Sequence, residues 1–116
     1  MSKPVAHYSA SYRAGDLLFV SGQVGIAAGS LAEGVENQTA QALSNVKAVL
    51  AQNDLTLEHV VKCTVFMTDI ENFGVVNATY AEIFGDHRPS RSAIAVKALP
   101  LGALVEIEAI AHLATS

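Results

Sequence analysis

The stretch RPSRSAIAVKALPLGALVEIEAIAHL, residues 88–113, decides the fold because it reads as two strands joined by a turn. The Leu-Pro-Leu-Gly sequence near its middle predicts a break between strands at about 91–97 and 103–113. Three of the charged residues in this apolar segment stand out: Arg91 begins the first strand, and Glu106 and Glu108 lie inside the second. They either occupy a solvated face or meet a charged partner in a partly dry place.

Two strands and a helix are expected upstream of this stretch. DLLFVSGQVG, residues 16–25, is a β-type run that ends in glycines, and HYSASY, 7–12, can pair with it as an edge strand. The Gly- and Ala-rich segment 25–34 reads as a loop. Apolar residues three and four apart then predict a helix from Val35 to a stop at Asn53: Ala42, Leu43, Val46, Val49 and Leu50.

A third strand and a second helix follow. VVKCTVFMT, residues 60–68, is rich in β-branched residues, and its alternation puts one set of side chains on each face: Val61, Cys63, Val65 and Met67 on the first, and Val60, Lys62, Thr64 and Phe66 on the second. Thr68 and Glu71 have the spacing of a capping box, and Gly85 suits a helix C-terminal cap. The helix between them has one apolar stripe: Phe73, Val76, Tyr80, Ile83 and Phe84.

These elements give the order β-β-α-β-α-β-β, an α+β sandwich in which two helices cover one face of a sheet, in a single domain over 1–116. In the last strand, the residues from Val105 to Leu113 alternate, so one set faces the helices and the other, with Glu106 and Glu108, faces away. That second face stays uncovered although it carries large apolar residues: Val60, Phe66, Leu104 and Ile110. Charged residues make up only 16% of the chain, so part of its surface is expected to be buried in an oligomer.

Composition and charge exclude several classes of protein. The net charge of −4 provides no basic footprint for nucleic acid. The start MSKPVAHYSA lacks a signal-peptide core, and the apolar runs are far short of a membrane span. The single cysteine, Cys63, fits a cytoplasmic protein, and the histidines at 7, 59, 87 and 112 have no metal-ligand spacing. We therefore expect a cytoplasmic protein without membrane, metal or cofactor.

The chain resembles the Rid proteins (reactive intermediate deaminases, also called the YjgF family). Four blocks carry the resemblance and cover nearly the whole chain: GDLLFVSGQVG, QALSNVKAVLAQNDLTLEHVVKCTVFMTD, FGVVNATYAEIFG and RPSRSAIAVKALPLGALVEIEAIA. The last is the most specific, because it combines Pro-x-Arg-Ser, Leu-Pro and Val-Glu-Ile-Glu-Ala-Ile-Ala. The resemblance implies a chorismate-mutase-like fold, a homotrimer around a barrel of sheets, and ligand pockets between subunits.

Two charged residues acquire catalytic roles from this resemblance. Arg91, which on its own would equally read as a strand-end arginine paired with an acid, would hold the substrate's carboxylate, for which a planar guanidinium is suited. Glu106, otherwise a structural acid, would position and polarise the hydrolytic water as a general acid and base. Glu108 would be structural. Arg91 and Glu106 are expected to line one cavity, from the same chain or from adjacent chains.

Four more residues would line the pocket by resemblance. Tyr8 lies thirteen residues before Ser21, the spacing of the family's pocket tyrosine, and Ser21 and Gly22 match a serine and a backbone N–H near the substrate. Ala93 stands where the best-known subgroup has a cysteine whose backbone contacts the ligand. Since that cysteine is not the nucleophile, its absence affects the expected substrate range rather than the reaction.

The resemblance implies an enamine/imine deaminase that hydrolyses 2-iminobutanoate, 2-iminopropanoate and similar imino acids to 2-keto acids and ammonia. Two alternatives stay open. A non-catalytic binder of small carboxylates would use the same arginine pocket. A ribonuclease or translation inhibitor, a function also attached to the family, is disfavoured by the acidic balance of the chain.

Overall fold

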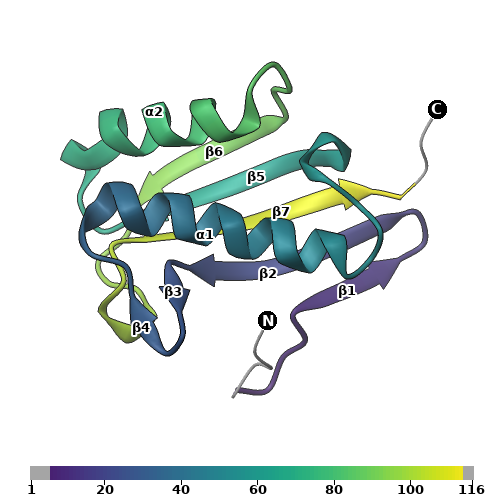
Figure 1. Ribbon diagram of the computed structural model, residues 1–116, viewed down its shortest axis with the longest axis horizontal. Coiled ribbons are helices and arrows are strands. Elements are labelled where there is room, and N and C mark those ends of the chain that lie inside the picture. The colour runs from purple at the N-terminus through teal and green to yellow at the C-terminus, as the bar shows by residue number, and fades with distance from the viewer. Residues whose placement is uncertain (1–5, 114–116) are drawn as a thin grey trace.

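Two helices lie on one face of a five-stranded sheet (Figure 1). The computed structural model describes residues 6–113. The elements, in chain order, are β1 (Ser11–Ala14), β2 (Leu17–Val24), β3 (Ile26–Ala27), β4 (Ser30–Leu31), α1 (Gly34–Ala51), β5 (Val60–Met67), α2 (Phe73–Phe84), β6 (Ser90–Ala95) and β7 (Val105–His112). Short 3₁₀ helices cover Leu57–His59, Ile70–Asn72 and Pro100–Gly102. This is the α+β sandwich that the sequence predicts.

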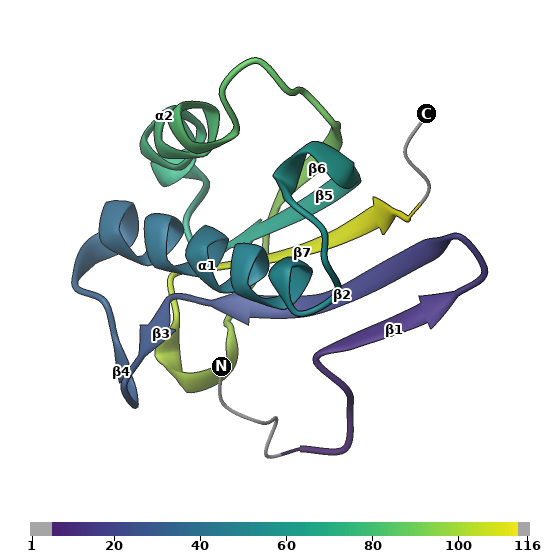
Figure 2. The same ribbon diagram turned by 45° about the vertical axis from the view of Figure 1, so that its right-hand side comes forward.

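The sheet has the order β1-β2-β7-β5-β6, so the last strand of the chain lies at its centre (Figure 2). β7 pairs antiparallel with both β2 and β5, while β6 pairs parallel with β5 alone and forms an edge. The strands that carry Arg91 and Glu106 are consecutive in sequence but are separated by β5 in space. This topology determines how the candidate site can be assembled.

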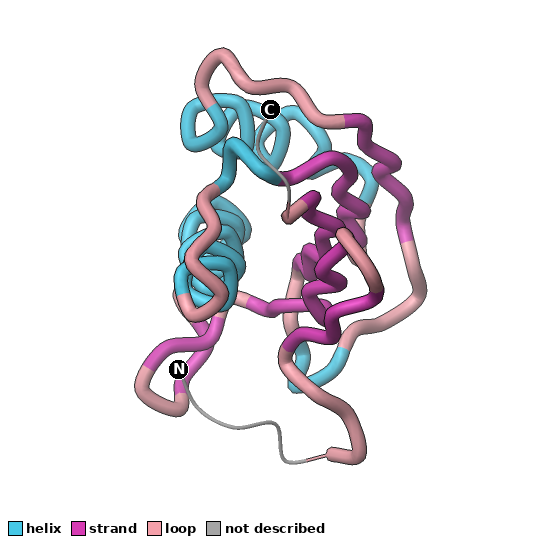
Figure 3. The backbone as a smooth tube through the Cα atoms, turned by 90° about the vertical axis from the view of Figure 1, so that its right-hand side faces the viewer, coloured by secondary structure: helices cyan, strands magenta, loops and turns pink. Residues whose placement is uncertain are grey.

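The core lies between the helices and the covered face of the sheet (Figure 3). Four alternate residues of β7 are buried there, as predicted: Val105, Ile107, Ala109 and Ala111. Their partners on α1 are the residues of its predicted apolar stripe, and Leu43, Val46 and Leu50 have no exposed surface. Burying such side chains contributes about 1.5–3 kcal/mol each, which makes this face the main source of stability.

Among residues 6–113, no helix lies over the opposite face of the sheet, as predicted (Figure 3). Phe66, Leu104 and Ile110 are half-buried there, and Ile94 of the edge strand is exposed. The predicted faces of the 60–68 strand are wrong at one end: Val60 is buried and Val61 is exposed. A register shift between Val60 and Lys62 causes the reversal, because one extra residue in a strand inverts the side chains before it.

Three local predictions are corrected by the structure. The first strand covers Ser11–Ala14 rather than 7–12. The expected loop 25–34 contains the hairpin of β3 and β4. Thr68 and Glu71 form no capping box; the Asp69 carboxylate instead accepts a hydrogen bond from the Glu71 backbone N–H at 2.9 Å, and α2 begins four residues later than Asp69.

The predicted helix ends agree better. Gly85 caps α2 with a positive φ of 67°, and its N–H donates to the Ala81 carbonyl. Helix α1 ends at Ala51, and the Asn53 side chain donates to the Val49 carbonyl at 2.9 Å, so it satisfies an acceptor of the last turn. Among residues 6–113, no helix combines the length and apolar character needed to cross a membrane.

Candidate functional site

Glu106 lies on the open face of the sheet, against Gly22 of β2. The pairing of β2 with β7 shifts register between Val20 and Gln23, so Ser21 and Gly22 form an irregularity beside the β7 carboxylates. A β-carbon at position 22 would collide with the Glu106 carboxyl group. The glycine lets the flexible end of the Glu106 side chain lie directly against the β2 backbone, and the structure brings two of the predicted site residues together.

Ser21 attaches the segment before β1 to the same place. Its backbone N–H donates to the Ala10 carbonyl at 3.0 Å, and its hydroxyl donates to the Ser9 carbonyl at 2.6 Å. Tyr8 directly precedes this attached segment and has 54% of its side chain exposed. The hydroxyl of Ser21 thus holds the chain that carries Tyr8, which is a structural task that the sequence does not predict.

The environment of Glu106 favours a carboxyl group that can exchange a proton. Burial raises the pKa of Glu106, and the negative charge of Glu108, two residues along the same face, raises it further. A general acid or base works best when its pKa lies closer to the operating pH than that of a free glutamate. Glu106 is half-buried whereas Glu108 is exposed, so the two glutamates differ in their contact with water.

Arg91 lies on the other face of the sheet. It pairs with Cys63 of β5, whose side chain is buried under the helices, and so it projects toward α2. Its Nη1 donates to Oδ1 of Asn77 at 2.9 Å. The guanidinium carbon also lies 4.8 Å from the ring centre of Tyr80 and 5.6 Å from that of Phe73. These contacts fix the orientation of a cation that keeps further N–H donors for a ligand.

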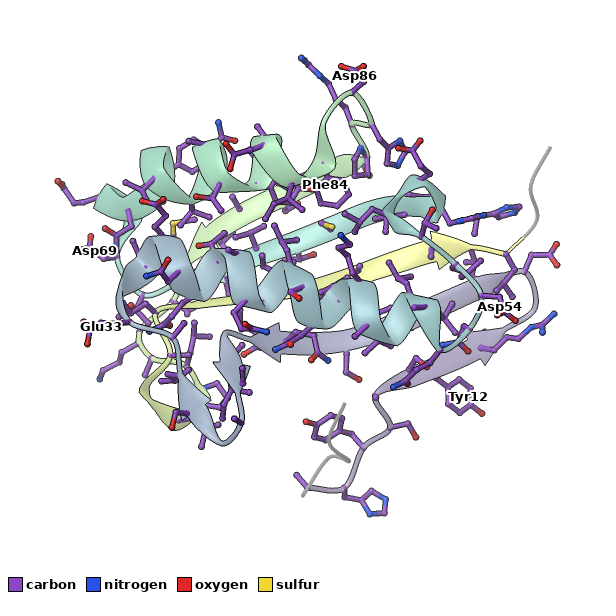
Figure 4. The ribbon with its side chains drawn as sticks, in the orientation of Figure 1. Tyr12, Glu33, Asp54, Asp69, Phe84 and Asp86 are labelled. Carbon is purple, nitrogen blue, oxygen red and sulfur yellow. The ribbon has the colours of Figure 1, made fainter. Side chains whose placement is uncertain are left out.

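A cavity of about 450 Å³ opens beside Arg91, between α2 and the edge of the sheet. Among the residues that the structure describes, its polar lining consists of cations and neutral groups, with no carboxylate: Asn77, Tyr80, His87, Arg88 and Arg91. Phe84 supplies an apolar wall and points from α2 toward the sheet, whereas Asp86 on the following loop points away from it (Figure 4). A concave site with guanidinium donors and no competing acid is suited to a small organic anion.

Ala93 shares the face of Arg91, two residues further along β6. Its side chain packs against the edge of the core, and β6 has no strand on its outer side among the described residues. Its backbone is thus available at the sheet edge for a ligand or another chain, which is the role that the resemblance assigns to it. The structure therefore groups Arg91 with Ala93, and Glu106 with Ser21 and Gly22.

The two groups do not meet within one chain. Arg91 lies on the helix-covered face of an edge strand, and Glu106 lies on the open face of the central strand with β5 between them. The version of the prediction in which one chain supplies both to one cavity is therefore wrong. The version in which adjacent chains supply one each stays a prediction.

Asn77 and Tyr80 are site residues that the sequence reasoning misses as such. The sequence predicts only packing for Tyr80, yet its ring lies under the Arg91 guanidinium, and its buried hydroxyl, beside Cys63, has no hydrogen-bond partner within residues 6–113. Burial raises the pKa of this hydroxyl, which stays protonated. The signal for Asn77 was available: it is a polar residue on the same side of α2 as Phe73 and Tyr80, at helical spacing.

Comparison with known proteins identifies the family. The family model described as Endoribonuclease L-PSP matches residues 1–113. The chain belongs to this family. The family contains proteins named RutC, YjgF and RidA, so the predicted Rid resemblance is confirmed. A RutC family protein of Pyrococcus horikoshii is 42% identical over 113 residues, which are 95% of this chain and 90% of that protein.

Solved structures of family members have the same fold. RidA from an Antarctic Psychrobacter is 35% identical with a TM-score of 0.91, covering 95% of this chain and 90% of that one. TdcF of E. coli, solved with bound serine, is 33% identical with a TM-score of 0.91, covering 95% of this chain and 91% of that one. The α+β fold of the L-PSP family is therefore established for this chain.

Proposed function

We propose that the protein is an imine deaminase that hydrolyses short 2-imino acids, such as 2-iminobutanoate and 2-iminopropanoate, or their enamine tautomers, to 2-keto acids and ammonia. The observation that carries the proposal is the carboxylate-free cavity at Arg91, in a chain whose family includes RidA. Cys63 is a buried free thiol, which suits the reducing cytoplasm that we propose as its location.

Arg91 would bind the carboxylate next to the imine carbon through two parallel N–H···O bonds. Asn77 supports this role because it occupies one side of the guanidinium and leaves the other donors free. The stacked rings of Tyr80 and Phe73 limit the directions in which the guanidinium can turn. Positioning of this kind accounts for a large part of the acceleration that a reactive substrate needs.

Glu106 would act on the water. Its carboxylate accepts a proton as the water oxygen bonds to the imine carbon, which gives a carbinolamine. The same carboxyl group returns the proton to the nitrogen. The carbon–nitrogen bond then breaks and ammonia leaves, while the carbinolamine hydroxyl gives its proton to the Glu106 carboxylate and becomes the carbonyl of the 2-keto acid. The raised pKa of Glu106 supports this proton transfer, because it makes the carboxylate a stronger proton acceptor than that of a free glutamate.

A homotrimer is part of the proposal. A small substrate cannot contact Arg91 and Glu106 through one sheet, so the reacting cavity would combine Arg91 of one subunit with Glu106 of its neighbour. The uncovered apolar face supports association, since isolated soluble chains rarely leave such a surface to water. The expected partners are therefore two further copies of this chain and the small-molecule substrate, with no nucleic acid and no membrane.

The test is the rate of 2-keto acid formation from imino acids that an amino-acid oxidase generates in place. The wild-type protein should exceed the spontaneous rate, and Arg91→Ala should lower the excess by roughly a hundredfold because charge-assisted hydrogen bonds are lost. Arg91→Lys should fail similarly, since an ammonium lacks the forked geometry. Arg13→Ala, at the opposite edge of the sheet, is the matched control and should behave as the wild type.

A binding protein for small carboxylates is the second candidate. The bound serine of TdcF favours it, because serine is an amino acid and not an imine. Wild-type protein that binds 2-oxobutanoate but releases no ammonia above the spontaneous rate would reject the deaminase and support the binding protein. Wild-type rates in Arg91→Ala would reject both, since each depends on the same guanidinium.

A further inference from the structure

The cavity beside Arg91 contains a second arginine that the proposed reaction does not use. Arg88 lines the same cavity from the segment that leads into β6. Pro89 follows it, and a residue before proline is restricted to extended backbone conformations. The Arg88 side chain is therefore presented to the cavity from a backbone with little freedom.

The two arginines differ in their contacts. Arg91 is half-buried, bonded to Asn77 and stacked on two rings. Arg88 is exposed and, within residues 6–113, makes no hydrogen bond, ion pair or ring contact. Its guanidinium has all its donors available, and no carboxylate of the cavity lining competes for them.

The positive charge at the cavity favours a ligand with more than one anionic group. Arg88 and Arg91 place two permanent positive charges at one cavity, and His87 adds a third basic side chain. Like charges at one cavity repel, and an anion bound to each relieves the repulsion. A volume of about 450 Å³ also leaves room beyond a monocarboxylate of three or four carbons, because pockets in the range of about 300–1,000 Å³ hold considerably larger ligands.

We infer that Arg88 determines substrate specificity by binding a second carboxylate, so that the preferred substrates are 2-imino dicarboxylic acids. Arg91 holds the carboxylate beside the imine carbon, and Arg88 holds the distal one. The inference rests on the proposed deaminase function and names its substrate class. The reaction is unchanged: water adds to the imine carbon, ammonia leaves, and a 2-keto dicarboxylate is the product.

Competition between two imines tests the inference. 2-Iminosuccinate and 2-iminobutanoate are generated in place by oxidases, and kcat/KM is measured for each. The wild-type protein should prefer the dicarboxylate, and Arg88→Gln should lower that preference by about tenfold or more, the range expected for a hydrogen bond to a charged group. Arg13→Gln removes the same charge at the far edge of the sheet and should keep the wild-type preference. Light scattering checks that each variant keeps the oligomeric state.

Two outcomes would overturn the role of Arg88. One is an equal loss for both imines in Arg88→Gln, and the other is a change of oligomeric state, since either means that Arg88 maintains the structure of the site. Calorimetric binding of 2-oxoglutarate and 2-oxobutanoate separates this inference from the proposed function. If no imine is hydrolysed but the wild type binds the dicarboxylate more tightly and Arg88→Gln removes the difference, the deaminase fails and the role of Arg88 stands.

Discussion

The two faces of the sheet are built from alternate residues of the same strands, yet the helices of the chain cover only one of them. On the covered face, Val105 and Ile107 have no exposed surface. On the open face, Phe19 is 41% exposed and Ile94 45% exposed, although both are large apolar residues. The covered face accounts for folding of the single chain, whereas the exposed apolar residues of the open face are typical of a surface that binds another protein.

Each face also carries one half of the candidate site. Arg91 and its cavity belong to the helix side, and Glu106 with Gly22 belongs to the open side. A trimer would therefore do more than hide apolar surface: it would bring the two halves together. Under this view, assembly is a condition for catalysis, and an isolated subunit would have an anion pocket without a proton acceptor.

Subunit mixing gives the largest expected effect. Arg91→Ala and Glu106→Gln should each lose about a hundredfold or more of the deaminase activity. When the two variants are co-expressed at equal amounts, about one quarter of the interfaces should combine an intact Arg91 with an intact Glu106, and activity should return to about that fraction. Formation of 2-keto acid by the mixed and the separate proteins is the measurement.

The control for mixing is co-expression of Arg91→Ala with Arg91→Lys, which supplies no intact arginine and should stay inactive. Mass spectrometry of the intact oligomer verifies that mixed species form. If verified mixed oligomers of Arg91→Ala and Glu106→Gln stayed inactive, the two residues would not share an interface cavity, and the comparison of the two faces would lose its functional meaning.

Two isoleucines of β7 test the faces as packing surfaces. Ile107→Ala should lower the free energy of unfolding by about 2–5 kcal/mol at any protein concentration, because it leaves a cavity between the sheet and the helices. Ile110→Ala, the same change on the open face, should act mainly through association, so its cost should depend on protein concentration. Denaturant unfolding at two concentrations, with light scattering, distinguishes them. If the wild-type protein were a stable monomer at micromolar concentration, the open face would not be a subunit interface.

Local patterns predicted the faces of β7 well. Every second residue from Val105 to Ala111 is apolar, and the pleat places these residues on one face of the sheet. The same reasoning failed at Val60 and Val61, because a register shift depends on how β5 meets β7 and leaves no mark in the alternation itself. The irregularity at Ser21 and Gly22, which makes space for Glu106, was hidden for the same reason.

The site was predicted residue by residue but not as an arrangement. Arg91 and Glu106 were found because unusual charges stood in an apolar segment that resembles a known motif. Their separation in space was not predicted. It arises because β7 lies between β2 and β5, and such long-range pairing cannot be read from the order of the strands in the sequence. Asn77 has the helical spacing that places it beside Phe73 and Tyr80, but its role in orienting Arg91 appears only once α2 is placed beside β6.

The smallest effect concerns how pH acts on the open face. Burial and the charge of Glu108 raise the pKa of Glu106, so the folded chain binds that proton more tightly than the unfolded one. The stability from this carboxyl is fully present below its ordinary pKa and is lost as pH rises through the raised pKa. Glu106→Gln should therefore raise the free energy of unfolding by about a few tenths of a kcal/mol at neutral pH and leave it unchanged in acid. Glu108→Gln should give part of that gain. Denaturant unfolding from about pH 4 to pH 8 measures both effects. This gain applies to the dissociated chain, because in the proposed trimer Arg91 of a neighbouring subunit would oppose the rise in the pKa of Glu106. A gain that shrinks as the protein is concentrated would support the shared cavity, and a loss of stability in the dissociated chain would contradict the raised pKa.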